Sequence, residues 1–249
     1  MRRKLAAGNW KMNGTTDALQ EIAALGRAHP EAAAEVLICP PATLIAPAAR
    51  TAGDGPIGIG GQDCHDEAEG AHTGDISAGM LADAGARAVI LGHSERRAAH
   101  HERSEDVRAK ARAAQAAGLM TIICLGESQL QREATNTLDI IGAQLSLSVP
   151  DGSTGENLVV AYEPIWAIGS GMTPTPDQIG EVHDFMRARL ERRFGAGVGR
   201  SVRLLYGGSV KGENAGEIFA ISNVDGALVG GASLTAGAFS PIISALETA

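Results

Sequence analysis

The sequence lacks any apolar run long enough to cross a membrane. No stretch approaches the ~20 consecutive apolar residues that a membrane-spanning helix needs. The N-terminal stretch MRRKLAAGNWKMNG is basic, but no sustained apolar segment precedes Gly8 and Asn9, so it is unlike a signal peptide. We therefore expect no membrane partner for this chain.

Positive charge is also in short supply. The 249 residues carry 29 acidic and 21 basic side chains, which gives a formal net charge of −8. A broad basic face for nucleic acid is therefore not expected. A small anion can still bind to such a protein through local groups, such as backbone amides and single lysines.

The chain has few cysteines. Cys39, Cys64 and Cys124 are widely spaced and form no C-x-x-C pair. This pattern predicts free thiols and a cytoplasmic location, because the cytoplasm is reducing.

No Pro/Ser-rich stretch or block of charge divides the sequence, so we expect residues 1–249 to form a single domain.

Short apolar runs recur along the chain, and most are continuous rather than alternating. Such runs are typical of strands in a parallel sheet that is covered on both faces. The eight runs are KLAAGNW, EVLICP, PIGIGGQ, AVILGH, LMTIICLG, NLVVAYEP, VRLLYGG and GALVGG. Segments with helical spacing lie between them, including residues 104–117 and 176–193. Ser104 and Thr175 provide helix-start chemistry, and Gly118 and Gly195 provide stops.

Repeated strand-then-helix units predict an α/β fold, a single (β/α)8 TIM barrel. The structural alternative is a doubly wound open sheet. The glycines within residues 56–61 resemble a dinucleotide-binding loop only loosely, because they lie inside a predicted strand. We expect a short helix after the third run, and one or two helical turns within residues 207–224.

Chemically active residues follow several of the predicted strands. In a barrel of this kind, the carboxyl ends of the strands form the active-site face. Each residue alone has a structural explanation, such as a solvated lysine, a core histidine, an ion-paired acid or an ordinary glycine turn. Their convergence on one face instead predicts an active site. The residues are Asn9, Lys11, His93, Ser94, Glu95, Glu163, Ser209, Gly230 and Gly231.

These residue types fit proton abstraction beside a carbonyl group. Burial disfavours the charged form of a carboxylate, which makes Glu163 a stronger base. His93 can polarise a carbonyl, and Lys11 supplies positive charge for a developing oxyanion. The Gly-Gly turns after the last two strands can present backbone amides to a phosphate. The predicted substrate is therefore a small phosphorylated sugar.

The segment after Glu163 predicts a lid. Pro164 and Trp166 stiffen one hinge, and residues 169–171 form a Gly-Ser-Gly tip. Closing such a segment over a reactive enediolate would exclude water and protect the intermediate.

Five motifs closely resemble those of the triosephosphate isomerase family: GNWKMNG, GHSERR, AYEPIWAIGSG, LYGGSV and LVGGASL. The resemblance runs nearly end to end and implies interconversion of dihydroxyacetone phosphate and glyceraldehyde 3-phosphate, in glycolysis and gluconeogenesis. It implies Glu163 as the base and neutral His93 as the electrophile, roles for which this family is itself the standard worked example of pKa tuning. No cofactor and no metal are implied.

The resemblance assigns further residues. Asn9 and Lys11 would contact the substrate, and Ser94 and Glu95 would orient Lys11 and, in the open state, Glu163. Cys124 would be structural. The set that would bind phosphate is Gly169, Ser209, Gly230 and Gly231.

Residues 61–77 resemble the family's protruding interface loop. The tip of that loop, Thr73, would dock beside the active site of a second copy, which implies a homodimer. The spacing of His65 and His72 also suits metal ligands, but the irregular loop argues against a metal site, and we predict none.

Three departures from the family pattern stand out. Met172, Thr173 and Pro174 replace the usual Lys-Thr-small lid hinge, which predicts altered lid kinetics. Asp75 replaces the usual Glu, which leaves the family's ion pair with Arg96 open. Residues 98–103 replace the usual aromatic-Gly pair, and no functional reason for this is evident.

Two alternative functions remain at this point. A paralogue acting on a four-carbon ketose phosphate, such as erythrulose phosphate, would use the same groups in a longer pocket. A non-catalytic phosphosugar-binding scaffold would be expected to have lost Glu163 or His93, and both are present.

Overall fold

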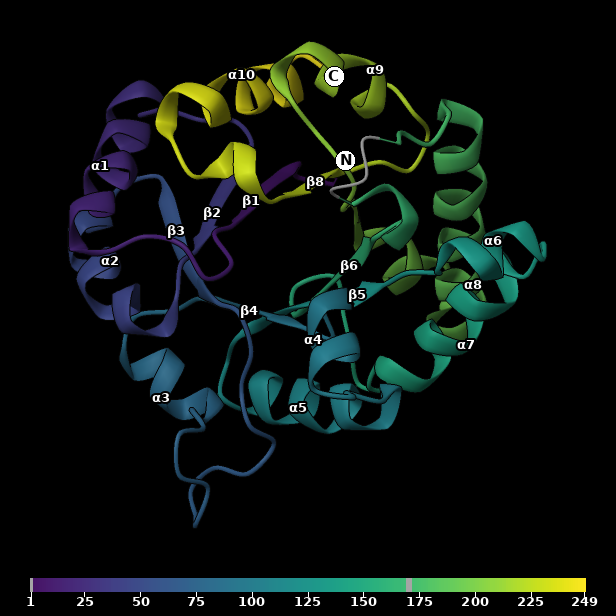
Figure 1. The fold of residues 1–249 in the computed structure, drawn as a ribbon, viewed down its shortest axis with the longest axis horizontal. Coiled ribbons are helices and arrows are strands. Elements are labelled where there is room, and N and C mark those ends of the chain that lie inside the picture. The colour runs from purple at the N-terminus through teal and green to yellow at the C-terminus, as the bar shows by residue number, and fades with distance from the viewer. Residues whose placement is uncertain (1, 169–171) are drawn as a thin grey trace.

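The computed structural model describes residues 2–168 and 172–249, and its centre is a closed barrel of parallel strands (Figure 1). Each strand pairs with the next, and β8 pairs with β1, so an open doubly wound sheet is excluded. The eight predicted runs all form strands. The strands are β1 Leu5–Asn9, β2 Glu35–Cys39, β3 Ile57–Gly61, β4 Ala88–Leu91, β5 Met120–Leu125, β6 Leu158–Tyr162, β7 Arg203–Tyr206 and β8 Gly226–Val229.

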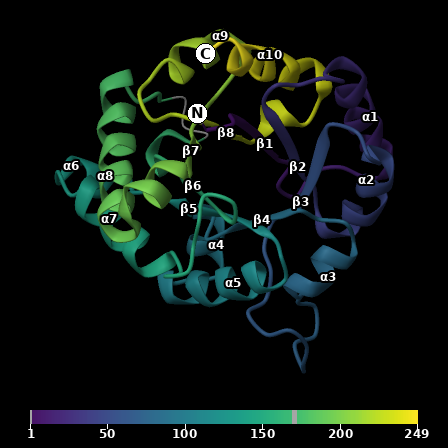
Figure 2. The same cartoon turned by 180° about the vertical axis from the view of Figure 1, so that it is seen from behind.

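Helices surround the barrel in both views (Figures 1 and 2). They are α1 Leu19–Ala28, α2 Ile45–Ala52, α3 Ala78–Asp83, α4 Ser94–Ala99, α5 Ser104–Ala116, α6 Gln129–Glu133, α7 Thr137–Ser148, α8 Pro176–Ser201, α9 Gly212–Phe219 and α10 Ala236–Glu247. The short α3 and α9 match the prediction. The additional helices α4 and α6, of six and five residues, were not predicted. Among the described residues, no helix is both long and apolar enough to cross a membrane.

The predicted helix boundaries mostly hold. The Thr175 hydroxyl accepts a hydrogen bond from the backbone amide of Gln178 and caps α8. Gly195 breaks α8 with φ 78° and ψ 159°, which is where the predicted helix was expected to end. The prediction for α5 was wrong in one detail, since the cap residue is Arg103 and not Ser104. The carboxylate of Asp106 accepts the Arg103 amide hydrogen at 2.9 Å instead.

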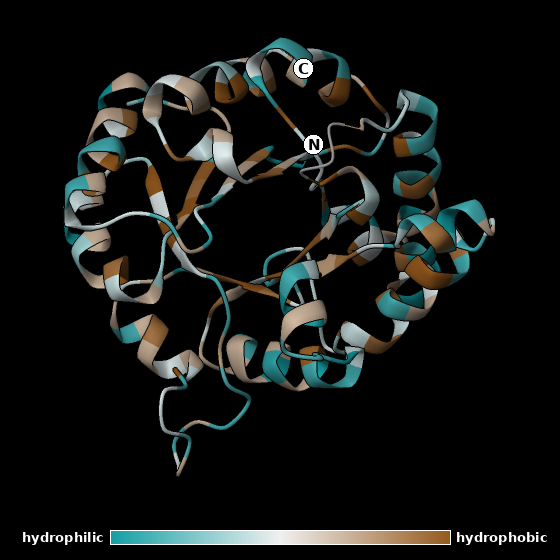
Figure 3. Ribbon diagram, viewed as in Figure 1, coloured by the Kyte–Doolittle hydropathy of each residue, from teal (hydrophilic) through white to brown (hydrophobic). Residues whose placement is uncertain are grey.

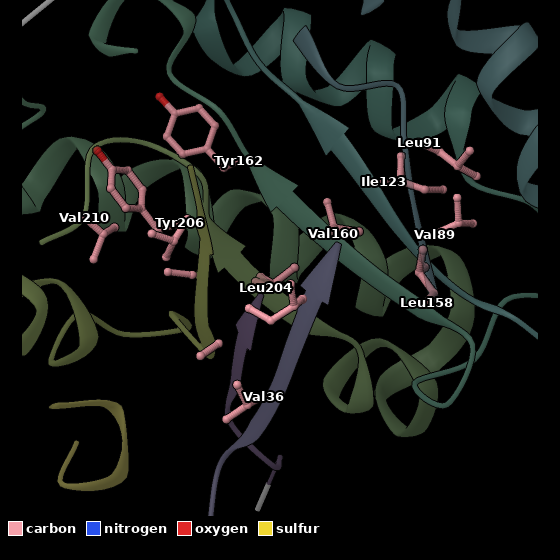
Figure 4. Packing of buried hydrophobic residues seen from close by; sticks show 14 of the residues in the cluster. Val36, Val89, Leu91, Ile123, Leu158, Val160, Tyr162, Leu204, Tyr206 and Val210 are labelled. Atoms are coloured by element: carbon pink, nitrogen blue, oxygen red, sulfur yellow. The ribbon is translucent and has the colours of Figure 1, made fainter. Parts of the chain in front are cut away.

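The core has two layers, because alternate residues of each strand face opposite sides of the sheet. One layer fills the barrel and includes Leu37, Ile90 and Ile122. The other lies between strands and helices and includes Val160 and Leu204 (Figure 4). The apolar colouring accordingly concentrates on the strands (Figure 3). Burying each aliphatic side chain contributes about 1.5–3 kcal/mol to the free energy of unfolding. The strand ends that carry the site are therefore supported by a stable core.

Candidate active site

A pocket of about 330 Å³ opens at the carboxyl ends of the strands. Pockets of this size are at the small end of those that hold small molecules. The pocket in this chain brings together all the predicted substrate-contacting residues that the structure describes. Its lining consists of Asn9, Lys11, His93, Glu163, Ile168, Gly207, Gly208, Ser209, Val210, Lys211, Leu228, Val229, Gly230, Gly231 and Ala232.

The carboxylate in this pocket is almost completely buried. Glu163 directly follows β6 and its residue is 2% exposed. Its Oε1 lies 2.8 Å from Nε2 of His93, and its Oε2 accepts a hydrogen bond from the backbone amide of Ser94 at 3.0 Å. The carboxylate is therefore held by two donors.

His93 is the cap residue of α4, and this position fixes its tautomer. The backbone amide of Glu95 donates to Nδ1 at 3.2 Å, so Nδ1 carries no proton and Nε2–H points at Glu163. Burial alone would lower the pKa of His93. The negative charge of the Glu163 carboxylate outweighs burial, so the pKa of His93 lies above its ordinary value. Protonating Nδ1 would remove the Glu95 bond, so the hydrogen bonding favours the neutral ring.

Lys11 has the left-handed backbone conformation, with φ of 53°. Its amide donates to Oδ1 of Asn9 at 2.9 Å, and the side-chain amide of Gln62 donates to its carbonyl oxygen at 2.8 Å. Its Nζ lies 2.6 Å from Oε1 of Glu95. A non-glycine residue with positive φ is costly, and such strain is often found at functional sites. These contacts hold the ammonium group at the mouth of the pocket.

Glycines let the backbone approach the pocket closely. A Cβ on Gly207 would lie 2.9 Å from Cγ of Glu163, so this position has no room for a side chain. Gly230 precedes the 3-10 turn Gly231–Ser233, and the indole Nε1 of Trp10 donates to the carbonyl oxygen of Ser233 at 2.9 Å. The indole thus ties this turn to the end of β1.

Sequence reasoning missed three residues around the pocket. Lys211 lines it, and its position just after the Gly-Gly-Ser-Val turn was a usable signal. Gln62 left no signal, because its contact with Lys11 joins distant parts of the chain. The third is Glu127, a fully buried carboxylate. It accepts hydrogen bonds from Tyr162 Oη at 3.1 Å and Trp166 Nε1 at 2.9 Å.

Other predicted residues lie elsewhere or outside the described part. Gly169 and the rest of the expected lid tip lie outside the described residues. Thr73 lies in an exposed loop that projects from the barrel between β3 and α3 (Figure 1). Within the described chain, Arg96 pairs with Asp63 and Glu102, and no pair with Asp75 is formed.

The three cysteines are free and buried. Burial raises the pKa of the Cys39 and Cys64 thiols to about 12. Burial also raises the pKa of Cys124 well above its ordinary value. The thiols therefore stay protonated and unreactive at neutral pH.

Fold and site together define an enzyme of the acid–base class on a (β/α)8 barrel. A sequence model described as triosephosphate isomerase matches residues 4–246. The chain belongs to the triosephosphate isomerase family and is an isomerase of that family.

The similarity to individual proteins extends over whole chains. The chain is 65% identical to triosephosphate isomerase of Ruegeria pomeroyi, covering 100% of this chain and 99% of that protein. It is 65% identical to the enzyme of Dinoroseobacter shibae, covering 99% and 100%. A crystal structure of triosephosphate isomerase from Bartonella henselae matches with a TM-score of 0.92 and 46% identity, covering 98% of each chain.

Proposed function

We propose that this chain interconverts dihydroxyacetone phosphate and D-glyceraldehyde 3-phosphate through an enediolate, as a step of glycolysis and gluconeogenesis. The observation that carries the proposal is the meeting of the Glu163 carboxylate, the Nε2–H of His93 and the Lys11 ammonium group in one small pocket. These are the base, the electrophile and the fixed charge that proton transfer beside a carbonyl requires.

In the proposed reaction, the substrate displaces the Glu163 carboxylate from His93 and Ser94. The freed carboxylate removes a proton from the carbon beside the carbonyl, and the electron pair moves onto the carbonyl oxygen. Nε2–H of His93 and Nζ of Lys11 stabilise the resulting oxyanion. Nε2–H of His93 gives its proton to this oxyanion and takes up the proton of the neighbouring hydroxyl group, so that the two oxygens exchange roles. Glu163 then returns the first proton to the carbon that carried the carbonyl, which leaves the enzyme unchanged.

Phosphate binding is proposed at the turns after β7 and β8. Ser209, Gly230 and Gly231 line the pocket there, and Gly169 of the lid would complete the set. Lys211 adds positive charge at the same side. Backbone amides in glycine turns suit an anion because nothing shields them. Asn9 would contact the substrate beside Lys11, and Ser94 and Glu95 would hold Glu163 and Lys11 in position.

Assembly and location belong to the same proposal. We propose a homodimer in which the loop around Thr73 docks on a second copy. The shape of the chain supports this, because the loop around Thr73 is exposed and projects from the barrel (Figure 1). A cytoplasmic location is supported by the three free thiols.

The test compares initial rates on glyceraldehyde 3-phosphate and on erythrulose 4-phosphate, with the same enzyme preparation. The 65% identity to triosephosphate isomerases over the whole chain favours the three-carbon substrate. A higher kcat/KM for the four-carbon sugar would overturn the substrate assignment. Binding without any exchange of solvent deuterium into the substrate would overturn the reaction itself.

A further inference from the structure

Backbone contacts join the two ends of the loop between β3 and α3, and the loop folds back on itself. The amide of His65 donates to the carbonyl oxygen of Ile76 at 2.8 Å, and His65 forms a β-bridge with Ser77. The rest of the loop projects away from the barrel (Figure 1). Near its tip, the ring of His72 stacks on the ring of His65 with a centroid distance of 4.0 Å. A residue near the tip thus contacts a residue at the base.

A carboxylate completes this group. The amide of Asp75 donates to the carbonyl oxygen of His72 at 3.0 Å, and Oδ2 of Asp75 lies 4.0 Å from Nε2 of His65. One ligand atom from each of His65, His72 and Asp75 lies within 4.8 Å of the others. We propose that these three side chains bind a divalent transition-metal ion of the zinc class.

The donor set selects this class of ion. Two imidazoles and one carboxylate suit zinc, whereas magnesium and calcium prefer oxygen ligands. Metal–ligand distances of about 2.0–2.1 Å in a tetrahedral site place ligand atoms about 3.3 Å apart. The 4.0 Å separation of His65 and Asp75 must therefore shorten by about 0.7 Å, and a separation at the 4.8 Å bound of the group would have to shorten by about 1.5 Å. The side chain of Asp75 is 59% exposed and can make this movement.

A second carboxylate is placed to support the first histidine. Oδ1 of Asp66 lies 3.4 Å from Nδ1 of His65, where the amide of Glu67 now donates at 3.0 Å. When His65 binds the ion through Nε2, its ring proton moves to Nδ1, and Nδ1–H then donates to Asp66. The Glu67 amide loses its acceptor and donates to water instead. No net proton is lost in this tautomer change. A carboxylate behind a ligating histidine is the usual arrangement in zinc sites.

The ion would be structural, with water in the fourth position. It would hold the region near the loop tip against the base, after the two rings move out of their present contact so that their nitrogens face the ion. This inference departs from the sequence-based expectation of no metal, which rested on the irregularity of the loop. All three ligands come from one chain, so one ion per chain is expected.

The test uses the tag-free full-length chain, stripped with a chelator and titrated with Co²⁺ by visible absorption and equilibrium dialysis. One tetrahedral Co²⁺ per chain, displaced by Zn²⁺, is expected. His65→Gln and His72→Gln should each weaken binding at least tenfold. The matched control changes two exposed histidines outside the loop, His100→Gln with His101→Gln, and should bind as the parent does.

Three results would overturn the proposal: no saturable binding, binding unchanged in His72→Gln, or binding lost in the control variant. Circular dichroism verifies that each variant is folded. Imidazole ¹⁵N spectra provide a second measurement on the unmodified chain. Zn²⁺ should move the His65 proton from Nε2 to Nδ1, and an unchanged His65 tautomer would also contradict the site.

Discussion

His183 shows how one buried residue makes stability depend on pH. The side chain is fully buried, with Nδ1 3.0 Å from the carbonyl oxygen of Asn223. Burial lowers its pKa from 6.5 to about 4, so the unfolded chain takes up a proton at a higher pH than the folded chain does. Stability therefore rises with pH between about 4 and 6.5, and the contribution reaches about 3 kcal/mol.

The prediction is that His183→Gln removes most of this dependence. Urea unfolding at pH 5 and pH 7 should give a smaller difference in the free energy of unfolding for the variant than for the parent. The exposed His101→Gln variant serves as the control and should keep the parental difference. Equal pH dependence in His183→Gln and the parent would contradict the assignment.

Gly207 controls the position of the proposed base. A Cβ there would lie 2.9 Å from Cγ of Glu163 and 3.0 Å from the carbonyl oxygen of Tyr162, so Gly207→Ala must displace one of them. A misplacement of about 1 Å can cost about 10²-fold in rate, and we expect kcat to fall by that order. Gly237→Ala, where a Cβ meets nothing within 4 Å, should retain parental kcat in the same assay.

At the scale of elements, the strands were predictable and the connections less so. Continuous apolar runs such as residues 158–162 predict buried parallel strands on local composition alone. Helix α4 is too short to show periodicity, and it forms because His93 caps it against the amide of Glu95. The proximity of Glu163 to His93 followed from the barrel, because strand ends share one face. The contacts of Gln62 and Glu127 join distant segments and left no local signal.

The segment that joins the predicted lid tip to α8 contains an unusual residue. Pro174 is buried and precedes Thr175, the cap of α8. Proline fixes φ and restricts Thr173, so Pro174→Ala should speed lid opening and lower stability by about 0.4–1 kcal/mol. Relaxation dispersion on the substrate-analogue complex measures the opening rate. Identical rates in the parent and the variant would rule out a role for this hinge.

At the scale of the whole molecule, the barrel supplies the site, and the loop around Thr73 would link the site to the proposed homodimer. We predict that Thr73→Arg weakens the proposed homodimer, because a charged side chain at the docking tip must be desolvated. Sedimentation should show a dimer for the parent and a monomer for the variant at the same concentration. Arg103→Lys, an exposed position on another surface, provides the control. A parent that sediments as a monomer would contradict the dimer.

We predict that residues 1–249 form a single domain. Because β8 pairs with β1, loss of either end opens the barrel. Limited proteolysis should therefore release no fragment that remains folded by circular dichroism.

The central claim is that Glu163 transfers the proton in a triose phosphate isomerisation. It is tested most directly by a coupled assay with glyceraldehyde 3-phosphate that compares the parent, Glu163→Asp and the exposed control Glu181→Asp. Shortening the buried side chain moves the carboxylate by about 1 Å, so kcat should fall by about 10²-fold or more with KM little changed. Glu181→Asp should match the parent. Negligible turnover by the parent, or equal kcat in Glu163→Asp, would contradict the account.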